Sequence, residues 1–205
     1  IASAQAALLG NRRLLMVGTD MAIGKMTAGI EIWREAQRRG VHTEFLATGQ
    51  IGIFVSGRGI ALDAIRVDYA CGAVERMVLD AADADLQVIE GQGSILHPGS
   101  TSTLPLLRGS CPTHIVLCHR AGNDRLEDHD IPVPPLADLI ALYEDMASAC
   151  GGFPRPKTIG VALNTSSLND GDAQHALETL SKEIKLPVVD PLRFGVTSLV
   201  DTLLN

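Results

Sequence analysis

The sequence has few aromatic residues and fewer basic than acidic residues. Phe, Trp and Tyr make up 3% of the chain, and 17 Lys and Arg residues stand against 24 Asp and Glu residues, a formal net charge of −7. Proteins that bind nucleic acids neutralise phosphates with basic side chains and stack bases on aromatic rings. Because both residue types are scarce, we predict no nucleic-acid partner.

Long hydrophobic runs and paired cysteines are also missing. Every apolar run is broken well before the ~20 residues that cross a bilayer, so we predict no membrane segment. Cys71, Cys111, Cys118 and Cys150 contain no Cys-x-x-Cys pair. A chain of this length can bury enough surface to fold without disulfides, so we expect reduced thiols in a cytoplasmic protein.

The first residues are apolar and rich in alanine before the first arginines, the reverse of the order in a secretory signal peptide. We expect residues 1–12 to be the end of a linker from a further N-terminal domain of the same protein. Residues 13–205 are then expected to form a single α/β domain.

Short apolar runs alternate with segments of helical period. The runs are almost continuously hydrophobic, as in strands covered on both faces, so the alternation predicts an α/β fold: a three-layer sandwich with a mainly parallel sheet. The predicted strands are Leu14–Val17, Thr43–Leu46, Leu86–Glu90, His114–Cys118, Thr158–Leu163 and Pro187–Val189. The predicted helices are Lys25–Arg39, Cys71–Ala82, Leu136–Ala149 and Ala173–Lys185, with a long connection at Ala121–Pro135.

The strongest motif is GTDMAIGK, between the first predicted strand and the first predicted helix. Loop amides, a helix N-terminus and a lysine ammonium together bind phosphate, which is the arrangement of a P-loop (Walker A motif). Five residues separate its two glycines, one more than is usual. The motif predicts a P-loop NTPase-like fold and a phosphate site made by Gly18, Thr19, Asp20, Gly24, Lys25, Met26 and Thr27.

One position departs from the usual P-loop. The residue after the lysine normally carries a hydroxyl that holds Mg²⁺, but here it is Met26, and the hydroxyl follows at Thr27. A thioether is a poor ligand for a hard cation. The loop is therefore better suited to hold a pyrophosphate than to cleave it.

A second glycine-bearing loop follows the third predicted strand in the run VIEGQGS. Glu90 ends the strand, where open α/β sheets bind ligands, and could hold Mg²⁺ if the protein uses it. The amides around Gly91, Gly93 and Ser94 could form a nest for an oxygen atom. The alternative is a tight turn with a solvated glutamate.

These two loops resemble those of dethiobiotin synthetase and its relatives, whose elements are GTD-x-x-x-GK and EG-x-G. The resemblance implies recognition of adenine by an asparagine after a later strand, and IGVALNT supplies Asn164. An asparagine that caps a surface turn is the alternative.

A closer resemblance covers nearly the whole chain. VGTDMAIGKMT, FLATGQIGI, VIEGQGSILHP, VLCHRAG, ALNTSSL and PVVDPLRFG are similar to successive motifs of a family that includes D-glutamate N-acetyltransferases. The resemblance implies transfer of an acetyl group from acetyl-CoA to the amine of an acidic D-amino acid. It also implies an additional N-terminal domain in full-length members.

Acetylation of an amine needs a general base, and an acidic substrate needs cations. Candidate bases are His119, which follows a predicted strand, and Asp63 and Asp68; a structural or solvated role is the alternative for each. Candidate substrate-binding residues are Gln50, Arg58, Arg120 and Arg193. A zinc site from Cys111, His114, Cys118 and His119 is disfavoured, because a strand directs neighbouring residues to opposite faces.

Three functions are compatible with these motifs. The first is the P-loop domain of an acetyl-CoA-dependent N-acetyltransferase. The second is a Mg-ATP-dependent ligase or carboxylase-like enzyme, and the third is a non-catalytic nucleotide-binding module. In each case we expect a small-molecule ligand and a homo-oligomer.

Overall fold

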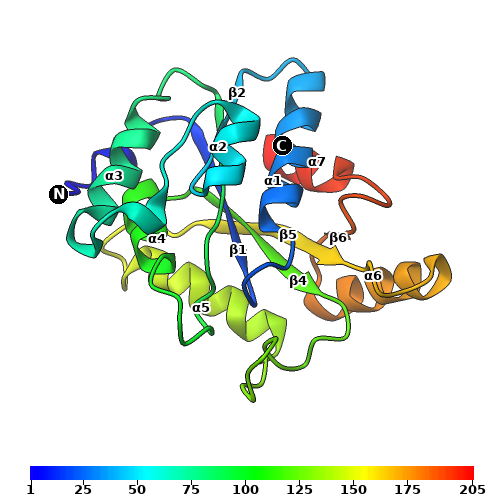
Figure 1. Cartoon of the computed structure of the whole chain (residues 1–205). Coiled ribbons are helices and arrows are strands. Elements are labelled where there is room, and N and C mark those ends of the chain that lie inside the picture. Colours follow the sequence, from blue (N-terminus) through cyan, green and yellow to red (C-terminus); the bar gives the residue numbers. More distant parts are fainter.

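The computed structural model describes residues 1–205 and contains one six-stranded sheet in which every pairing is parallel. The strand order is β2-β3-β1-β4-β5-β6. Figure 1 shows β1, β4 and β5 in the middle of the molecule. All six strands lie where the apolar runs predict them, so the mainly parallel sheet is confirmed. The strands are β1 (Arg12–Gly18), β2 (Thr43–Leu46), β3 (Leu86–Ile89), β4 (His114–Arg120), β5 (Lys157–Asn164) and β6 (Val188–Val189).

Seven α-helices and two short 3-10 helices connect the strands. The four predicted helices are present, although α3 begins four residues before the predicted start at Cys71; α2, α4 and α7 were not predicted. The helices are α1 (Lys25–Arg38), α2 (Gln50–Ser56), α3 (Val67–Leu79), α4 (Thr103–Ser110), α5 (Leu136–Ser148), α6 (Asp170–Ile184) and α7 (Thr197–Leu204). The 3-10 helices span Gln5–Leu8 and Leu62–Ala64.

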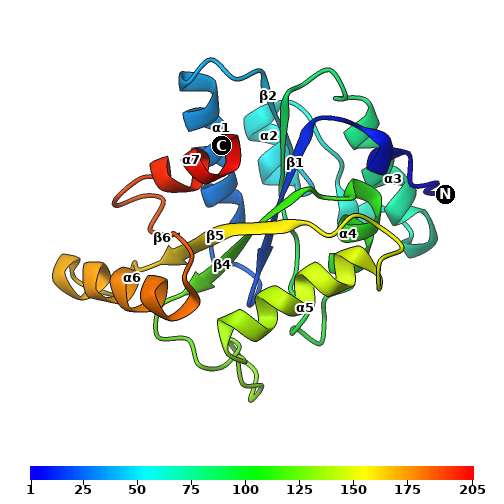
Figure 2. The same cartoon turned by 180° about the vertical axis from the view of Figure 1, so that it is seen from behind.

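Helices cover both faces of the sheet. Along β1, Leu14 and Met16 pack into the core beneath α1 and α7, and Leu15 and Val17 pack into the core beneath α3, α4 and α5. Alternate residues of a strand point to opposite faces, so one apolar run serves both cores. Helices α1 and α7 lie on one side of β5 and α5 on the other (Figures 1 and 2), which confirms the three-layer sandwich.

The parallel arrangement brings the loops that carry the motifs to one edge of the sheet. Strand β1 lies between β3 and β4, with Leu15 paired to Ile89 and Gly18 paired to Cys118. The loop after β1 therefore lies between the ends of its two neighbours. Residues 121–135 connect β4 to α5 without a helix or strand, as predicted.

The first twelve residues pack against the same domain. Ala6, in the first 3-10 helix, is completely buried, and that helix contacts α3 and α4. The buried Arg13 donates hydrogen bonds to the backbone oxygens of Leu9 and Asn11, which fixes the entry into β1. None of the helices combines the length and the hydrophobicity that a bilayer-crossing segment requires.

Candidate nucleotide-binding site

The loop between β1 and α1 has the backbone of a phosphate-binding loop. Gly24 adopts φ +110°, a conformation that residues with a side chain rarely take, and α1 begins at the next residue, Lys25. The carbonyl of Gly24 accepts the first helical hydrogen bond, from the amide of Ala28. The free amides of the first turn and the positive end of the helix dipole therefore face the ligand side of the loop.

Lys25 is a buried cation without a carboxylate partner. Its side chain is 6% exposed, and its Nζ donates a hydrogen bond of 2.6 Å to the backbone oxygen of Asp20. Burial lowers the pKa of Lys25, although the nearby Cys118, Asp20 and Glu90 act in the opposite direction. A buried ammonium without a paired charge is costly, and a phosphate would supply that charge.

Thr19 and Asp20 hold the loop in place instead of lining the ligand side. Both are buried, and the two oxygens of Asp20 accept hydrogen bonds from the amides of Met21 and Glu127, each at 2.7 Å. Glu127 belongs to the long connection after β4. Asp20 therefore attaches the phosphate loop to that connection.

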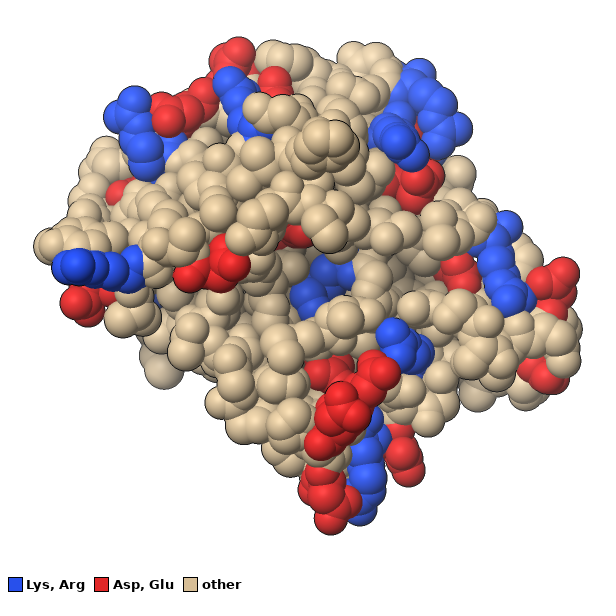
Figure 3. Space-filling view, in the orientation of Figure 1, with Lys and Arg blue, Asp and Glu red and all other residues tan.

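A cavity of about 650 Å³ opens over Lys25. Its walls come from four segments: residues 21–27 of the phosphate loop and α1, residues 90–93 after β3, residues 99–102 before α4, and Leu62, Asp63 and Ile65. Figure 3 shows the hollow near the centre of the molecule, with basic side-chain atoms at its floor. Lys25 is the single basic residue of the lining, beside the acidic Asp63 and Glu90.

Glu90 joins β3 to the loop after β2. Its Oε2 accepts hydrogen bonds from the amides of Thr48 (2.8 Å) and Gly49 (3.1 Å), while Oε1 has no hydrogen-bond partner in the protein. Burial raises the pKa of Glu90, and the two amides and Lys25 partly offset this. Nowhere in the chain do three His, Cys, Asp or Glu side chains gather as a metal site would require.

The two glycine-bearing loops are in direct contact. Ser94 is buried, and its Oγ donates a hydrogen bond of 2.9 Å to the backbone oxygen of Thr19. A Cβ atom on Gly91 would lie 1.6 Å from the backbone oxygen of Met16 in β1, so only glycine fits there. Gly93 lines the cavity beside Gln92. The segment 91–94 thus forms one wall of the phosphate loop.

A second, smaller cavity of about 140 Å³ lies on the other side of the phosphate loop. It shares Ile23, Gly24 and Thr27 with the larger one. Asn164, at the end of β5, lines it; its Oδ1 accepts from the amide of Ser166 at 3.0 Å, and its Nδ2 lies 3.5 Å from the oxygen of Ile23. Asn164 therefore lies beside the loop that the resemblance associates with it.

His119 does not line either of these cavities. Its Nδ1 lies 3.0 Å from the Oγ1 of Thr19, and burial lowers the pKa of His119 to about 4. The ring borders a separate hollow of about 420 Å³ between the connection after β4 and α6. At neutral pH the imidazole is therefore uncharged and hydrogen-bonded to Thr19 of the phosphate loop.

Of the two candidate aspartates, Asp63 lines the large cavity and Asp68 does not. The Nε2 of Gln50 donates hydrogen bonds to both carboxylate oxygens of Asp63, at 2.9 and 3.2 Å. This pair links the start of α2 to the second 3-10 helix. Asp68 is exposed in the first turn of α3.

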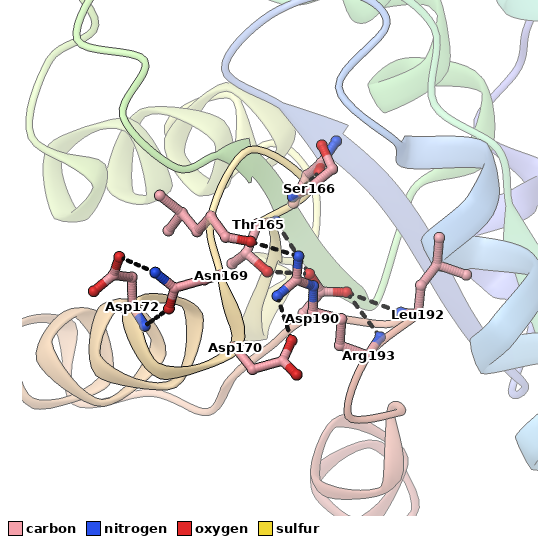
Figure 4. Close-up of polar contacts among 10 residues, drawn as sticks. Thr165, Ser166, Asn169, Asp170, Asp172, Asp190, Leu192 and Arg193 are labelled. Carbon is pink, nitrogen blue, oxygen red and sulfur yellow. Dashed lines mark hydrogen bonds and ion pairs between the residues drawn. The ribbon is translucent and has the colours of Figure 1, made fainter.

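The three candidate arginines are paired within the protein and lie outside the lining of the large cavity. Arg58 pairs with Glu44 at 3.3 Å, and Arg120 pairs with Glu127 at 2.9 Å. Arg193 pairs with Asp170 at 2.8 Å (Figure 4). The structure thus places part of the predicted phosphate-binding set around the large cavity, namely residues 24–27, Glu90, Gly91 and Gly93, but none of the predicted carboxylate-binding arginines.

Two residues important to the site were not singled out from the sequence. Asp190, after β6, lines the smaller cavity. Thr48, after β2, donates a hydrogen bond from its backbone amide to Glu90. Each follows a predicted strand at the ligand-binding edge of the sheet. That position is the signal that could have identified them.

A parallel sheet with a buried lysine between a central strand and the following helix defines the class of P-loop proteins. Residues 1–200 match the family model described as "Domain of unknown function (DUF1611_C) P-loop domain", and the chain belongs to this family. A crystal structure of a DUF1611 family protein from Anabaena variabilis matches all of this chain and 60% of its own, with 49% identity and a TM-score of 0.97.

Curated relatives have an enzyme name. Two proteins named D-glutamate N-acetyltransferase, from a Pseudoalteromonas species and from Tritonibacter scottomollicae, are each 36% identical to this chain. Each match covers 94% of this chain but 58% of the relative, so this chain spans little more than half of their length.

More distant structures share the fold. Cobyrinic acid a,c-diamide synthase from Mycobacterium smegmatis, with a bound ATP analog and magnesium, matches 94% of this chain and 91% of its own, at 11% identity and a TM-score of 0.55. MinD from Aquifex aeolicus matches 94% of this chain and 95% of its own, at 9% identity and a TM-score of 0.51. At such low identity the likeness concerns the fold alone.

Proposed function

We propose that this chain is the P-loop domain of an acetyl-CoA-dependent N-acetyltransferase that acts on an acidic D-amino acid, D-glutamate in the first instance. The names of the two curated relatives support this reaction. Because those relatives are longer, the proposal includes a further domain of the full-length protein. A cytoplasmic location and self-association are also parts of it.

The observation that carries the proposal is the buried Lys25 in the wall of the larger cavity, next to Gly24 and Thr27, which line both cavities. Coenzyme A is an adenine nucleotide with a pyrophosphate. Lys25 and the free amides at the start of α1 would hold the pyrophosphate. Asn164 would face the adenine in the smaller cavity, which leaves the larger cavity for the rest of the cofactor. When bound, acetyl-CoA supplies the acetyl group as a thioester.

The residues around Lys25 suit a nucleotide that is held without hydrolysis. Met26 stands where a magnesium-binding hydroxyl is usual, and Thr27, which lines both cavities, can donate to a phosphate oxygen. Binding of coenzyme A should therefore be independent of Mg²⁺.

In the reaction, the amine nitrogen forms an amide bond to the acetyl carbon and the carbon–sulfur bond breaks. The amine proton passes to a base, and coenzyme A leaves as the thiol. Asp63 is the candidate base that lines the large cavity, and the uncharged His119 is the alternative. Arg58, Arg120 or Arg193 would have to leave its present partner to bind a substrate carboxylate, unless the further domain provides the cation.

Calorimetry and a thiol-release assay test the proposal. The full-length protein should bind coenzyme A equally well with and without Mg²⁺ and should release thiol from acetyl-CoA when D-glutamate is present. Lys25→Ala should abolish binding, and L-glutamate is the control substrate. Absence of both thiol release and N-acetyl product would contradict the proposal.

The second candidate is a Mg-ATP-dependent ligase, and one observation favours it. Glu90 lines the same cavity as Lys25 and has one unpaired carboxylate oxygen, which could hold a magnesium-bound water. This function predicts Mg-dependent ADP release that increases in Met26→Thr. Under the transferase proposal, Met26→Thr should leave acetyl transfer largely intact. Ligand binding without any turnover would indicate a non-catalytic module.

A further inference from the structure

The carboxylate of Asp190 is buried beside the smaller cavity and accepts four hydrogen bonds (Figure 4). Its Oδ2 accepts from the amide (3.0 Å) and the hydroxyl (2.5 Å) of Thr165, and its Oδ1 accepts from the amides of Leu192 (3.0 Å) and Arg193 (3.1 Å). Burial alone would raise the pKa of Asp190, but these hydrogen bonds together lower it. The carboxylate is therefore held ionised.

These bonds join the two loops that wall the smaller cavity. Thr165 follows β5 directly after Asn164, whereas Leu192 and Arg193 follow β6. The side chain of Arg193 adds a second link, because it pairs with Asp170 and donates to the backbone oxygen of Leu168 at 2.6 Å. Both loops are thus fixed around charged groups.

The surface that remains for a ligand is largely apolar with a few polar groups. Pro191, Leu192 and Ala162 contribute apolar atoms, and Asn164 contributes a carboxamide. Leu192 is 73% exposed, so its side chain is available to contact a planar ring. A flat aromatic base, with a polar edge toward Asn164, has the matching chemistry.

The occupied state of Asp190 decides which base fits. Two oxygens with four donors are at the full capacity of a carboxylate, so Asp190 has no acceptor left for a ligand. Guanine carries N–H donors at N1 and N2 that a free carboxylate would satisfy, and burying them without acceptors is costly. Adenine has an acceptor at N1, and its only donor group at this edge is the N6 amino group. The Oδ1 atom of Asn164 can accept a hydrogen bond from N6 in addition to the one from Ser166.

We propose that Asp190 is a positioning residue that shapes the smaller cavity into a pocket selective for adenine over guanine. This rests on the proposed function in one respect, namely that the phosphate loop holds the pyrophosphate of a nucleotide. Thr165 disfavours guanine because its amide and hydroxyl already donate hydrogen bonds to Oδ2 of Asp190. The side chain of Leu192 contacts the base.

Calorimetry with ADP, GDP and inorganic pyrophosphate separates the base pocket from the phosphate loop. Wild-type protein should bind ADP at least about tenfold more tightly than GDP, a cost of about 1.4 kcal/mol for unpaired donors. Leu192→Ala should weaken ADP binding by about fivefold without changing pyrophosphate binding. Phe194→Ala is the matched control, since Phe194 is exposed in the same loop but does not line this cavity.

A second variant tests the selectivity itself. Thr165→Val removes the hydroxyl donor and frees acceptor capacity on Asp190, so the ratio of ADP to GDP affinity should fall toward one while pyrophosphate binding is retained. A merely structural role for Thr165 would weaken both nucleotides alike. Urea unfolding shows whether each variant is folded. If Thr165→Val does not fold, Leu192→Ala still tests the inference.

Equal affinity for ADP and GDP in the wild type, or an equal effect of Leu192→Ala on ADP and pyrophosphate, overturns the inference. These results are independent of catalysis. Adenine selectivity without acetyl transfer would uphold the pocket and refute the proposed function. Acetyl transfer with equal ADP and GDP affinities would support the proposed function and refute the selective pocket.

Discussion

His119 lies at the end of β4 with its ring bonded to Thr19 of the phosphate loop. Its lowered pKa has a consequence for stability. The folded protein protonates His119 only near pH 4, whereas an unfolded chain takes up the proton near pH 6.5. The stabilising contribution is therefore complete above about pH 6.5 and is lost as the pH falls from about 6.5 to 4.

We predict that wild-type protein loses about 3 kcal/mol more unfolding free energy than His119→Gln between pH 7.5 and pH 4. Glutamine cannot take up the proton, so the variant lacks this contribution. Urea titrations at the two pH values measure the difference. His175→Gln, on the exposed face of α6, is the control and should follow the wild type. Equal losses for His119→Gln and wild type would show that the ring is not held uncharged.

Gly91 is the residue at which the second loop meets β1. We predict that Gly91→Ala lowers the unfolding free energy by about 3 kcal/mol and weakens pyrophosphate binding, because the added methyl group would overlap the backbone oxygen of Met16. Gly10→Ala, where the methyl group would meet no atom within 4 Å, should leave both unchanged. Denaturation and calorimetry measure the two effects.

The phosphate-loop residues could be predicted because their chemistry is local: a strand, a turn and a helix that are consecutive in sequence. The partners of Arg58, Arg120 and Arg193 could not. Each pairs with a carboxylate that the fold brings near, such as Asp170 for Arg193, 23 residues away in the chain. A residue type indicates what a side chain can bind, but tertiary packing selects which partner it meets.

Among the elements, the buried strands were predicted well and the short helices poorly. A strand covered on both faces is a continuous apolar run, which is visible in the sequence. Helix α2 contains Gly52 and β-branched residues, and α4 contains Pro105 and Gly109, all of which disfavour helices. Their contacts with the rest of the protein compensate, and the sequence does not display those contacts.

The start of helix α2 is held by Glu90, whose carboxylate accepts hydrogen bonds from the amides of Thr48 and Gly49 just before the helix begins. We predict that Glu90→Gln increases hydrogen exchange in α2 by about tenfold, since the charge-assisted bonds are worth about 1.5 kcal/mol. Exchange in α1 should not change. Mass spectrometry of peptic fragments resolves the two helices.

Glu44→Gln is the matched control for that experiment. Glu44 also binds the segment around α2, through Arg58, but this pair is at the surface, where ion pairs contribute little. Exchange in α2 should therefore stay close to that of the wild type. If Glu44→Gln and Glu90→Gln had equal effects, Glu90 would have no special role in holding the helix.

At the scale of the whole molecule, the sheet contributes residues to two hydrophobic cores, of 21 and 20 buried residues. Trp33, the single tryptophan, packs beside Phe45 against the core under α1. Its fluorescence therefore reports on that layer, whereas circular dichroism reports on the entire fold. Leu139 of α5 lies in the opposite core.

We predict that Leu139→Ala lowers the unfolding free energy by about 3 kcal/mol. The unfolding midpoint should shift by the same amount whether it is followed by the fluorescence of Trp33 or by circular dichroism. The strands bury alternate residues in both cores, so one layer cannot unfold alone. Leu199→Ala in α7 is the counterpart in the other core and should also shift both signals together. Separate transitions would mean that the layers unfold independently.

The position of β1 in the middle of the sheet affects how the chain is made. Translation produces residues 12–18 before their strand partners, which begin at residues 86 and 114. At roughly 5 to 20 residues per second, a ribosome needs about 5 to 20 seconds to reach residue 120 after residue 18. During that interval an apolar segment has no partner on at least one side, so nascent chains of intermediate length are the stage at which chaperones have the most to protect.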